Sequence, residues 1–409
     1  MTSTRLTLRD FVKRKKVENF EKRIGYFQEF LSDLKKNKEY FFMRKVLSPM
    51  DREVVVEDGQ QKRKMLMFGS NNYLGFANHP YIQEKCIEAI REFGTGVGGP
   101  PLLNGYILLV RQLEERLAGF KGKEKAIVFP SGYATNVGIF SALPSHHDMV
   151  FVDREHHASC FDGLELGSNP FKTWKHNEVD HLERLLQEEK NKRDTFIAIE
   201  GVYSMKGDLS PLQEVVQVAK KYGSYLILDD AHGTGVMEQN GKGTAHHFGV
   251  AEEVDLLMGT FSKTFSIAGG FAAGGKELID YLRYFAHPYV FSGGITPLTA
   301  ATVLAGLDLL EKDQSIVQKL HSNIVYFKEL CRSRCVPIRE GESAIFTLPV
   351  PLGKDIRKMV CEFHEKNIFV NAIEYPAVLK GDECFRISLS AVHTKEDLER
   401  LVGIIEDIL

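Results

Sequence analysis

The stretch YLILDDAH, residues 225–232, is an apolar run that ends in two carboxylates and an imidazole. A second stretch, VDLLMGTFSK, residues 254–263, is an apolar run that ends in hydroxyls and an amine. Ligand chemistry in an open α/β sheet usually lies where buried strands end. We therefore expect these two sets of polar groups to meet at one edge of a sheet.

Asp229 and Lys263 indicate a cofactor when they are taken together. Pyridoxal phosphate requires an amine that forms a Schiff base and a carboxylate that keeps the pyridine nitrogen protonated. Either residue alone is as readily explained as a surface lysine or an ion-paired aspartate. The pair favours the cofactor.

The surrounding sequence predicts a mainly parallel sheet. Between the glycine cluster at 94–99 and about residue 290, helical stretches alternate with apolar runs, at 126–129, 149–152, 195–199 and 225–228. Such alternation is typical of βα units. Outside this region we expect short strands at 52–56, 64–68, 345–348, 369–370 and 385–389, a helix at 81–93 and one or two helices over 299–332.

Composition narrows the class of protein. The 409 residues are 43% hydrophobic and 26% charged, as in ordinary globular proteins of two or three domains. A net charge of −3 gives no indication of a nucleic-acid partner. The six cysteines lack disulfide or zinc spacing, so we expect no metal site. With no signal-peptide pattern and no transmembrane segment, we expect a cytoplasmic protein.

Residues 1 to about 45 predict an amphipathic arm. Apolar side chains recur there at helical spacing, at Phe20, Ile24, Phe27, Phe30, Leu31 and Leu34. We expect this stripe to pack on the body of the protein or on a partner subunit. A solvated helical face is the alternative.

Three further strand ends carry polar groups. FPSGYATN, residues 129–136, leads into a helix and would form either a phosphate cradle or a plain serine N-cap. A histidine of HHAS, residues 156–159, would stack on a cofactor ring or be structural. EGVYSMKGD, residues 200–208, ends another strand in a polar turn. So many polar strand ends favour a site over scaffolding alone.

The motifs resemble those of a known enzyme family. FGSNNYLG, FPSGYATN, HHAS, EGVYSMKGD, DDAHGTG, GTFSKT and FRISLSAVHT occur in the order found in the α-oxoamine synthases, and the resemblance covers residues 45 to 409. Within that family it is strongest to the bacterial serine palmitoyltransferases. It implies an α/β, aspartate-aminotransferase-like (fold type I) enzyme. The implied domains are an N-terminal arm with short strands (1–60), a large cofactor domain (61–295) and a small α+β domain (296–409).

The resemblance also implies a reaction. Family members use pyridoxal phosphate to condense an amino acid with an acyl thioester, with loss of carbon dioxide. The expected substrates are L-serine and a long-chain acyl-CoA. Glycine or alanine with another acyl-CoA or acyl-carrier-protein thioester is the alternative. A non-catalytic subunit is disfavoured because Lys263 and Asp229 are retained, and the motif set disfavours an aminotransferase.

By resemblance, site residues can be assigned. Lys263 would form the Schiff base, Asp229 would face the pyridine nitrogen, and His157 would stack on the ring. His232 and Ser204 would face the phenolic oxygen. The phosphate would be bound by Ser131, Gly132, Tyr133 and Thr260. The carboxylate of the amino acid would be bound by Asn71 and Arg386. Arginine suits a carboxylate because its donors are planar and paired.

The sequence departs from the family pattern in two places. In GGPPLLNG, residues 98–105, Pro101 stands at an arginine position, and Val110 follows where many members have histidine. In relatives, the segment that corresponds to FSGG, residues 291–294, has more hydroxyl groups and reaches the phosphate of the neighbouring subunit. Ser292 is the hydroxyl residue that this chain retains there. The resemblance thus implies a homodimer with the active site at the interface, while the departures leave the substrate open.

Overall fold

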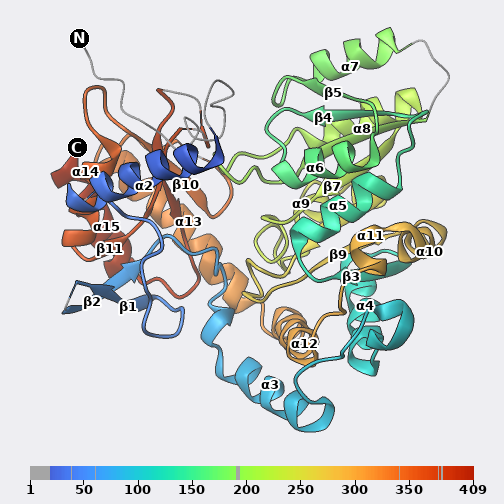
Figure 1. The fold of residues 1–409 in the computed structure, drawn as a ribbon, viewed down its shortest axis with the longest axis horizontal. Helices are drawn as coiled ribbons and strands as arrows, with labels where there is room; N and C mark the ends of the chain where they lie inside the picture. Colours follow the sequence, from blue (N-terminus) through green and yellow to red (C-terminus); the bar gives the residue numbers. More distant parts are fainter. Residues whose placement is uncertain are drawn as a thin grey trace.

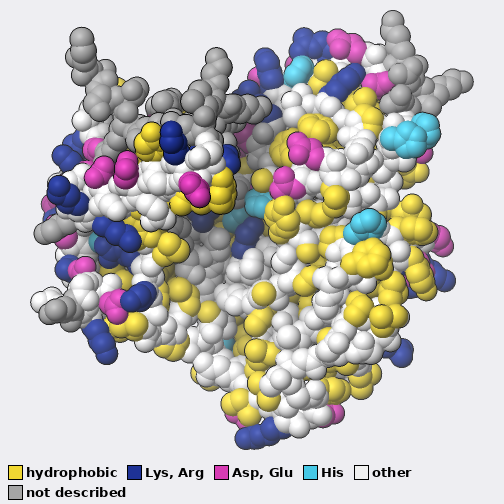
Figure 2. Space-filling view, viewed as in Figure 1, with side chains coloured by type: hydrophobic (Ala, Val, Ile, Leu, Met, Phe, Trp, Pro, Cys, Tyr) yellow, Lys and Arg dark blue, Asp and Glu magenta, His cyan; other side chains and the backbone are white. Residues whose placement is uncertain are grey.

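The chain forms two lobes separated by a hollow (Figures 1 and 2). The computed structural model describes residues 19–37, 39–59, 61–189, 194–339, 341–375, 377–378 and 381–409. One lobe is built on a seven-stranded sheet, and the other contains two three-stranded sheets. Histidine and basic side chains are visible on the walls of the hollow (Figure 2).

The large sheet has the strand order β3-β9-β8-β7-β6-β4-β5. Its strands are β3 (Lys125–Phe129), β4 (Met149–Asp153), β5 (Phe171–Trp174), β6 (Thr195–Glu200), β7 (Tyr225–Asp229), β8 (Leu256–Thr260) and β9 (Gly270–Gly274). The five strands from β8 to β5 are parallel, whereas β9 runs antiparallel to both of its neighbours. The predicted mainly parallel α/β fold is confirmed.

Helices cover both faces of this sheet, which explains why its strands are apolar throughout. Val150 and Val152 of β4 pack on one face against a cluster that includes α5 (Gly132–Ala142), α6 (Ala158–Gly167), α10 (Lys276–Phe285) and α11 (His287–Val290). Phe151 packs on the other face with α7 (Val179–Glu188), α8 (Leu212–Tyr222) and α9 (Thr244–His247). The polar ends of the strands are thus the part of the sheet left open to a ligand.

The second lobe joins segments from both ends of the sequence (Figure 1). One sheet has the order β1-β2-β11, and the other has the order β10-β13-β12. The strands are β1 (Glu53–Asp58), β2 (Gln61–Met67), β10 (Ile345–Pro349), β11 (Ile368–Phe369), β12 (Asn371–Ile373) and β13 (Cys384–Ser388). The helices are α2 (Phe20–Lys36), α13 (Ser315–Ser333), α14 (Ile356–Glu365) and α15 (Lys395–Ile408). Because β11 pairs with β2, a C-terminal strand completes the sheet that the two N-terminal strands begin.

Four elements connect the lobes or flank the large sheet. They are η1 (Phe76–Asn78), α3 (Pro80–Phe93), α4 (Leu108–Lys121) and α12 (Pro297–Lys312). The glycine-rich segment ends in a π-helical turn, η2 (Pro101–Gly105). The domain boundaries at residues 60 and 295 remain a prediction.

The N-terminal arm is only partly packed. Phe30 and Leu34 of α2 are buried, so the end of the predicted apolar stripe packs on the body. Phe20 and Ile24, earlier in the stripe, are 68% and 45% exposed. Residues 1–18 of the predicted arm lie outside the described residues. None of the helices in the described ranges combines the length and the apolar character that crossing a membrane requires.

Candidate active site

The predicted strand ends meet in one pocket of about 310 Å³. Asp229 ends β7, and Lys263 follows the neighbouring parallel strand β8 by three residues. The pocket brings together most of the predicted residues: Ser131, Gly132, Tyr133, His157, Ser204, Asp229, His232, Thr260 and Lys263. Convergence of the ends of parallel strands is the physical reason.

Asp229 is held by two N–H donors. The Asn136 side-chain amide donates to Oδ2 at 2.7 Å, and the backbone N–H of Ala231 donates to Oδ1 at 3.0 Å. The residue is 4% exposed. These donors stabilise negative charge on a carboxyl group that water hardly reaches. Asp229 is therefore suited to pair with a protonated ring nitrogen.

Lys263 has an amine that is easily deprotonated. Burial lowers the pKa of Lys263 to about 8, against the opposing influence of the carboxyl groups of Asp229 and Glu200. An amine with this pKa is substantially neutral at slightly alkaline pH, whereas an ordinary lysine is not. Lys263 can therefore act both as a nucleophile and as a base.

His157 is oriented through a hydrogen-bonded chain that starts at Asp229. The Asn136 amide nitrogen also donates to Ser159 Oγ at 3.0 Å, and Ser159 Oγ lies 2.7 Å from His157 Nδ1. Burial lowers the pKa of His157. The imidazole ring is thus neutral and fixed at one nitrogen, as ring stacking on a cofactor requires.

His232 is fixed by a tyrosine from the segment before η1. The hydroxyl of Tyr73 lies 2.7 Å from His232 Nδ1, and both side chains are buried. Burial lowers the pKa of His232 well below its ordinary value, with the positive charges of Lys263 and Arg386 acting in the same direction. His232 therefore lines the pocket as a neutral ring, with Tyr73 bonded to its Nδ1.

The start of α5 forms an anion cradle. Ser131 caps this helix, and its Oγ accepts from the N–H of Ala134 at 3.0 Å. A Cβ atom at Gly132 would lie 2.7 Å from Thr260 Oγ1, so only glycine allows this approach. The hydroxyls of Thr260 and Ser262 lie 2.9 Å apart at the same place. Exposed N–H groups with hydroxyls at a helix start fit a phosphate.

Asn71 and Arg386 lie beside this pocket. Arg386 Nη1 donates to the Ser204 carbonyl at 3.2 Å, while its buried Nε has no partner among the described residues. Asn71 Oδ1 accepts from the hydroxyls of Ser388 and Tyr73, each at 3.3 Å. Arg386 thus contacts Ser204 of the pocket lining, and Asn71 contacts Tyr73, the partner of His232. The unpartnered Nε leaves a donor for a ligand.

Ser292 lies away from the pocket of its own chain. Its hydroxyl donates to the carbonyl of Pro288, and the next glycine pair contacts the 98–105 segment, where the N–H of Gly294 donates to the Gly99 carbonyl at 3.0 Å. Val110, the other departure, is 1% exposed and packs in the main core. Valine at this position therefore serves packing.

The sequence did not reveal several residues of the site. Each lies in a motif from which a different site residue was predicted. The residues are Tyr73, Asn136, Ser159, Glu200 and Ser262. Asn136 offered one signal, since it lies about one helical turn after Gly132 and so faces the same edge of the sheet.

Asp230, the second carboxylate of DDAH, is structural. Lys121 Nζ donates to Asp230 Oδ2 at 2.9 Å, and the two side chains are 0% and 1% exposed. Lys121 also donates to Thr234 Oγ1 at 2.8 Å, and Asp230 accepts from the Thr244 hydroxyl at 2.7 Å. This buried pair fixes the turn that follows Asp229.

The residues of the pocket fit pyridoxal phosphate. The anion cradle, Asp229 and Lys263 face one cavity, as the phosphate, ring nitrogen and aldehyde of that cofactor require. Among the described residues, no group of three or more His, Cys, Asp or Glu side chains is arranged to hold a metal ion.

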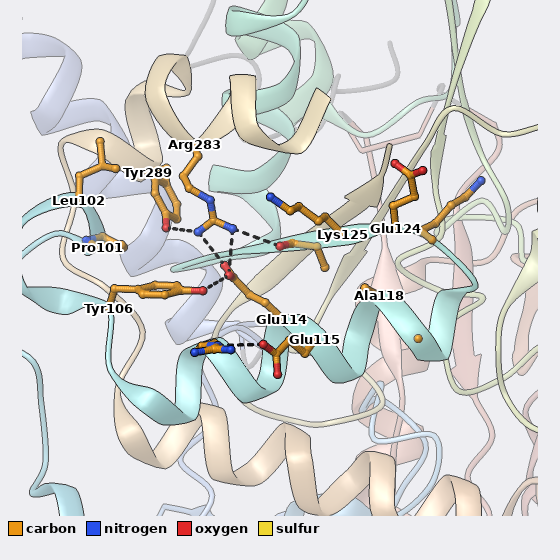
Figure 3. A pocket seen from close by; sticks show the side chains of 14 residues that line it. Pro101, Leu102, Tyr106, Glu114, Glu115, Ala118, Glu124, Lys125, Arg283 and Tyr289 are labelled. Carbon is orange, nitrogen blue, oxygen red and sulfur yellow. Dashed lines mark hydrogen bonds and ion pairs between the residues drawn. The ribbon is translucent and has the colours of Figure 1, made fainter. Parts of the chain in front are cut away.

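A larger cavity of about 600 Å³ lies beside η2, away from this chemistry (Figure 3). Its central group is an ion pair between a half-buried arginine and a buried carboxylate, in which Arg283 Nη2 donates to Glu114 Oε2 at 3.0 Å. The hydroxyl of Tyr106 also donates to Glu114 at 2.8 Å, and Arg283 donates to that of Tyr289 at 2.9 Å. These charges satisfy each other, so the arrangement serves structure.

The low pKa of Lys263 predicts how the cofactor is taken up. We expect the rate at which apoprotein binds pyridoxal phosphate covalently to rise with pH, with a midpoint near 8, because the neutral amine is the nucleophile. An ordinary lysine titrates near about 10.4. Stopped-flow absorbance between pH 6 and 9.5 measures this, with Nα-acetyl-lysine as the control amine. A rate that is flat between pH 6.5 and 9 contradicts the prediction.

Comparisons with known proteins agree with this geometry. Residues 63–405 match the family model described as aminotransferase class I and II. The chain is 38% identical to serine palmitoyltransferase of Bacteriovorax stolpii over 374 residues, covering 91% of this chain and 88% of the relative. It is also 38% identical to 8-amino-7-oxononanoate synthase of Thermosipho melanesiensis over 373 residues, covering 91% and 94%.

Solved structures show the same similarity. The serine palmitoyltransferase of Sphingomonas wittichii superposes with a TM-score of 0.90 at 29% identity, covering 96% of this chain and 98% of that one. The S. paucimobilis serine palmitoyltransferase, solved with PLP and myriocin bound, also gives 0.90, at 26% identity and the same coverage.

Proposed function

The chain belongs to the aminotransferase class I and II family and, within it, to the pyridoxal-phosphate-dependent α-oxoamine synthases, and from this premise we propose that it condenses L-serine with a long-chain acyl-CoA. The products would be an α-amino ketone resembling 3-ketosphinganine, free CoA and carbon dioxide, as in sphingolipid biosynthesis. The observation that carries the proposal is the pocket that joins Asp229 and Lys263, with Arg386 bonded to Ser204 of its lining.

A second candidate keeps the chemistry and changes the substrates. It uses glycine or alanine with another acyl-CoA or an acyl-carrier-protein thioester, as 2-amino-3-ketobutyrate CoA ligase or 8-amino-7-oxononanoate synthase would. The similarity to an 8-amino-7-oxononanoate synthase, at the same 38% identity as the serine palmitoyltransferase, supports it. The departure at Pro101 leaves both open.

The residues of the chain have separate tasks in either reaction. When bound, pyridoxal phosphate supplies an electron sink for the charge that develops at the amino-acid Cα. Asp229, with its two N–H donors, keeps the negative charge that the ring nitrogen needs. Lys263 removes the Cα proton, for which an amine of pKa about 8 is well matched near neutral pH.

Arg386 and Asn71 would decide which bond breaks first. Arg386 Nε has no partner among the described residues, and Asn71 is bonded to Ser388, two residues after Arg386 in the chain. Holding the amino-acid carboxylate there keeps the Cα–H bond directed toward Lys263, so orientation favours proton removal over early decarboxylation.

Thiol release identifies the substrates. Purified holoenzyme is mixed with serine, glycine or alanine and with acyl-CoA or carrier-protein thioesters of graded chain length, and free thiol is followed together with carbon dioxide. We expect serine with long-chain acyl-CoA to give the highest kcat/KM. Turnover confined to glycine or alanine with other thioesters supports the second candidate, and no turnover with any pair refutes both.

We also propose that the enzyme works as a homodimer with active sites at the subunit interface. An exposed apolar patch, here called the α10–α11 patch, supports a second copy as its occupant; it comprises Leu102, Leu103, Tyr281, Tyr284, Phe285 and Phe291. Figure 2 shows hydrophobic side chains gathered over α10 and α11. Large apolar patches of this kind mark association surfaces. Ser292, next to Phe291, would then reach the partner's phosphate cradle.

A charge in the α10–α11 patch is expected to break the dimer. Tyr284 is 65% exposed, and Tyr284→Glu should weaken association about 30-fold or more, because the interface would bury an unpaired carboxylate. Sedimentation velocity over a concentration series measures it. Leu352→Glu, at a fully exposed apolar position in the second lobe, is the matched control and should stay dimeric. A wild-type enzyme that is monomeric and fully active contradicts the proposal.

A cytoplasmic location fits the same function. The spacing of the six cysteines in the sequence is not that of a disulfide framework, as is usual where thiols stay reduced.

A further inference from the structure

Glu200 places a second carboxyl group beside Asp229 in the pocket. It ends β6, and the register of the sheet pairs it directly with Asp229 at the end of β7. Residues paired across neighbouring parallel strands point to the same face of a sheet. Glu200 is 3% exposed, and both residues line the cavity that contains Lys263.

The Glu200 carboxyl group is less fully hydrogen-bonded than that of Asp229. The backbone N–H groups of His157 and Ser204 are close enough to influence the pKa of Glu200, so its carboxyl group lies between two loops that each carry a predicted cofactor contact. Oε1 has no hydrogen-bond partner among the described residues. Asp229, by contrast, receives a donor at each oxygen.

This difference decides where a shared negative charge resides. Two buried carboxylates side by side are strongly unfavourable, and one of them keeps its proton. Burial and the charge of Asp229 raise the pKa of Glu200 well above its ordinary value, while Lys263 and the backbone N–H groups of His157 and Ser204 act in the opposite direction. The other titratable groups near Glu200 are the buried thiol of Cys160 and the buried phenol of Tyr203, and the pKa of each is raised mainly by burial.

We propose that Glu200 is a positioning residue that acts as a neutral carboxylic acid, bracing the loops of His157 and Ser204 while leaving the negative charge of the pocket to Asp229. Glu200 has this role only if Asp229 and Lys263 contact the cofactor as proposed above. Identity of the amino acid or the acyl donor does not affect it.

Glu200→Gln and Glu200→Ala separate the two parts of this role. Glutamine keeps the shape and an acceptor oxygen without a charge. We expect Glu200→Gln to shift the pH midpoint of the bound-cofactor absorbance by less than about 0.3 unit. If Glu200 were instead a charged carboxylate near Lys263, its removal would lower this midpoint by about 1 unit or more. Glu200→Ala should weaken binding of pyridoxal phosphate to apoprotein about tenfold, since the brace for two loops is lost.

Stability of the apoprotein gives a readout without the cofactor. A carboxyl group whose pKa is raised by folding destabilises the protein above its unfolded-state pKa, and the full penalty is reached above the folded-state pKa. The melting temperature of Glu200→Gln, relative to that of the wild type, should therefore increase as pH rises. Glu155→Gln, which removes a carboxylate bonded to Lys206 at 2.7 Å outside the pocket, is the control.

Two outcomes overturn the inference. One is a downward shift of about 1 pH unit or more in Glu200→Gln with no shift in Glu155→Gln, which means that Glu200 is ionised. The other is wild-type cofactor affinity in Glu200→Ala, which means that Glu200 does not hold the loops of His157 and Ser204 in place. If Glu200→Ala fails to fold, the Glu200→Gln titration still decides the charge. Absence of any cofactor absorbance in the wild type would instead refute the proposed function.

Discussion

Replacing Lys263 with alanine is expected to lower kcat/KM for thiol release by about 10³-fold or more, because both the base and the covalent attachment of the cofactor are lost. The amine lies in the same pocket as Asp229, and its pKa is lowered to about 8, mainly by burial. The variant should also lose the visible absorbance of covalently bound cofactor. Thiol release and the absorption spectrum are measured on the same preparation.

Lys206→Ala is the matched control for this variant. Lys206 follows Ser204 by two residues, and its amine bonds to Glu155 instead of facing the pocket. It should retain the spectrum and turnover within about threefold, as expected for loss of a partly exposed ion pair. Full turnover by Lys263→Ala would show that the assigned chemistry is wrong.

Replacing Lys121 with methionine is expected to lower the free energy of unfolding by about 3–5 kcal/mol, because it leaves the carboxylate of Asp230 buried without a counter-charge. The pair is closed from water, at 0% and 1% side-chain exposure. Guanidinium denaturation followed by fluorescence and circular dichroism measures the change.

Lys125→Met provides the comparison. Lys125 pairs with Asp280 at 2.8 Å, but these side chains are 38% and 40% exposed. Its loss should cost less than about 1 kcal/mol, as for surface pairs in general. Equal effects for the two variants would mean that burial of the Lys121–Asp230 pair does not determine its contribution.

The sequence predicted those parts of the structure that depend on local pattern. Apolar runs identified β3, β4, β6, β7 and β8, since strands covered on both faces have no polar alternation. It missed β9, whose sequence GFAAG has small residues at four of its five positions and no β-branched residue, so its pattern is weak. That strand forms only because two neighbouring strands pair with it.

The same distinction holds for the site. Asp229 and Lys263 could be expected to meet because both follow parallel strands. The contact of Tyr73 with His232 joins residues 159 positions apart, and the Asn136 bond to Asp229 joins residues 93 apart. No local pattern encodes the contact of Tyr73 with His232, and Asn136 has only its helical spacing as a signal. Both contacts depend on how the second lobe and the helices pack on the sheet.

The pairing of β2 with β11 has a consequence for synthesis of the chain on the ribosome. Asn371 donates to the carbonyl of Gly69 across 302 positions of sequence, next to this pairing. The edge of β2 that pairs with β11 therefore stays unpaired until almost the whole chain has emerged. Such unpaired edges favour pairing with wrong partners. We expect a nascent chain halted before residue 368 to contain a folded large sheet but no competent carboxylate site, and to depend on chaperones during that interval.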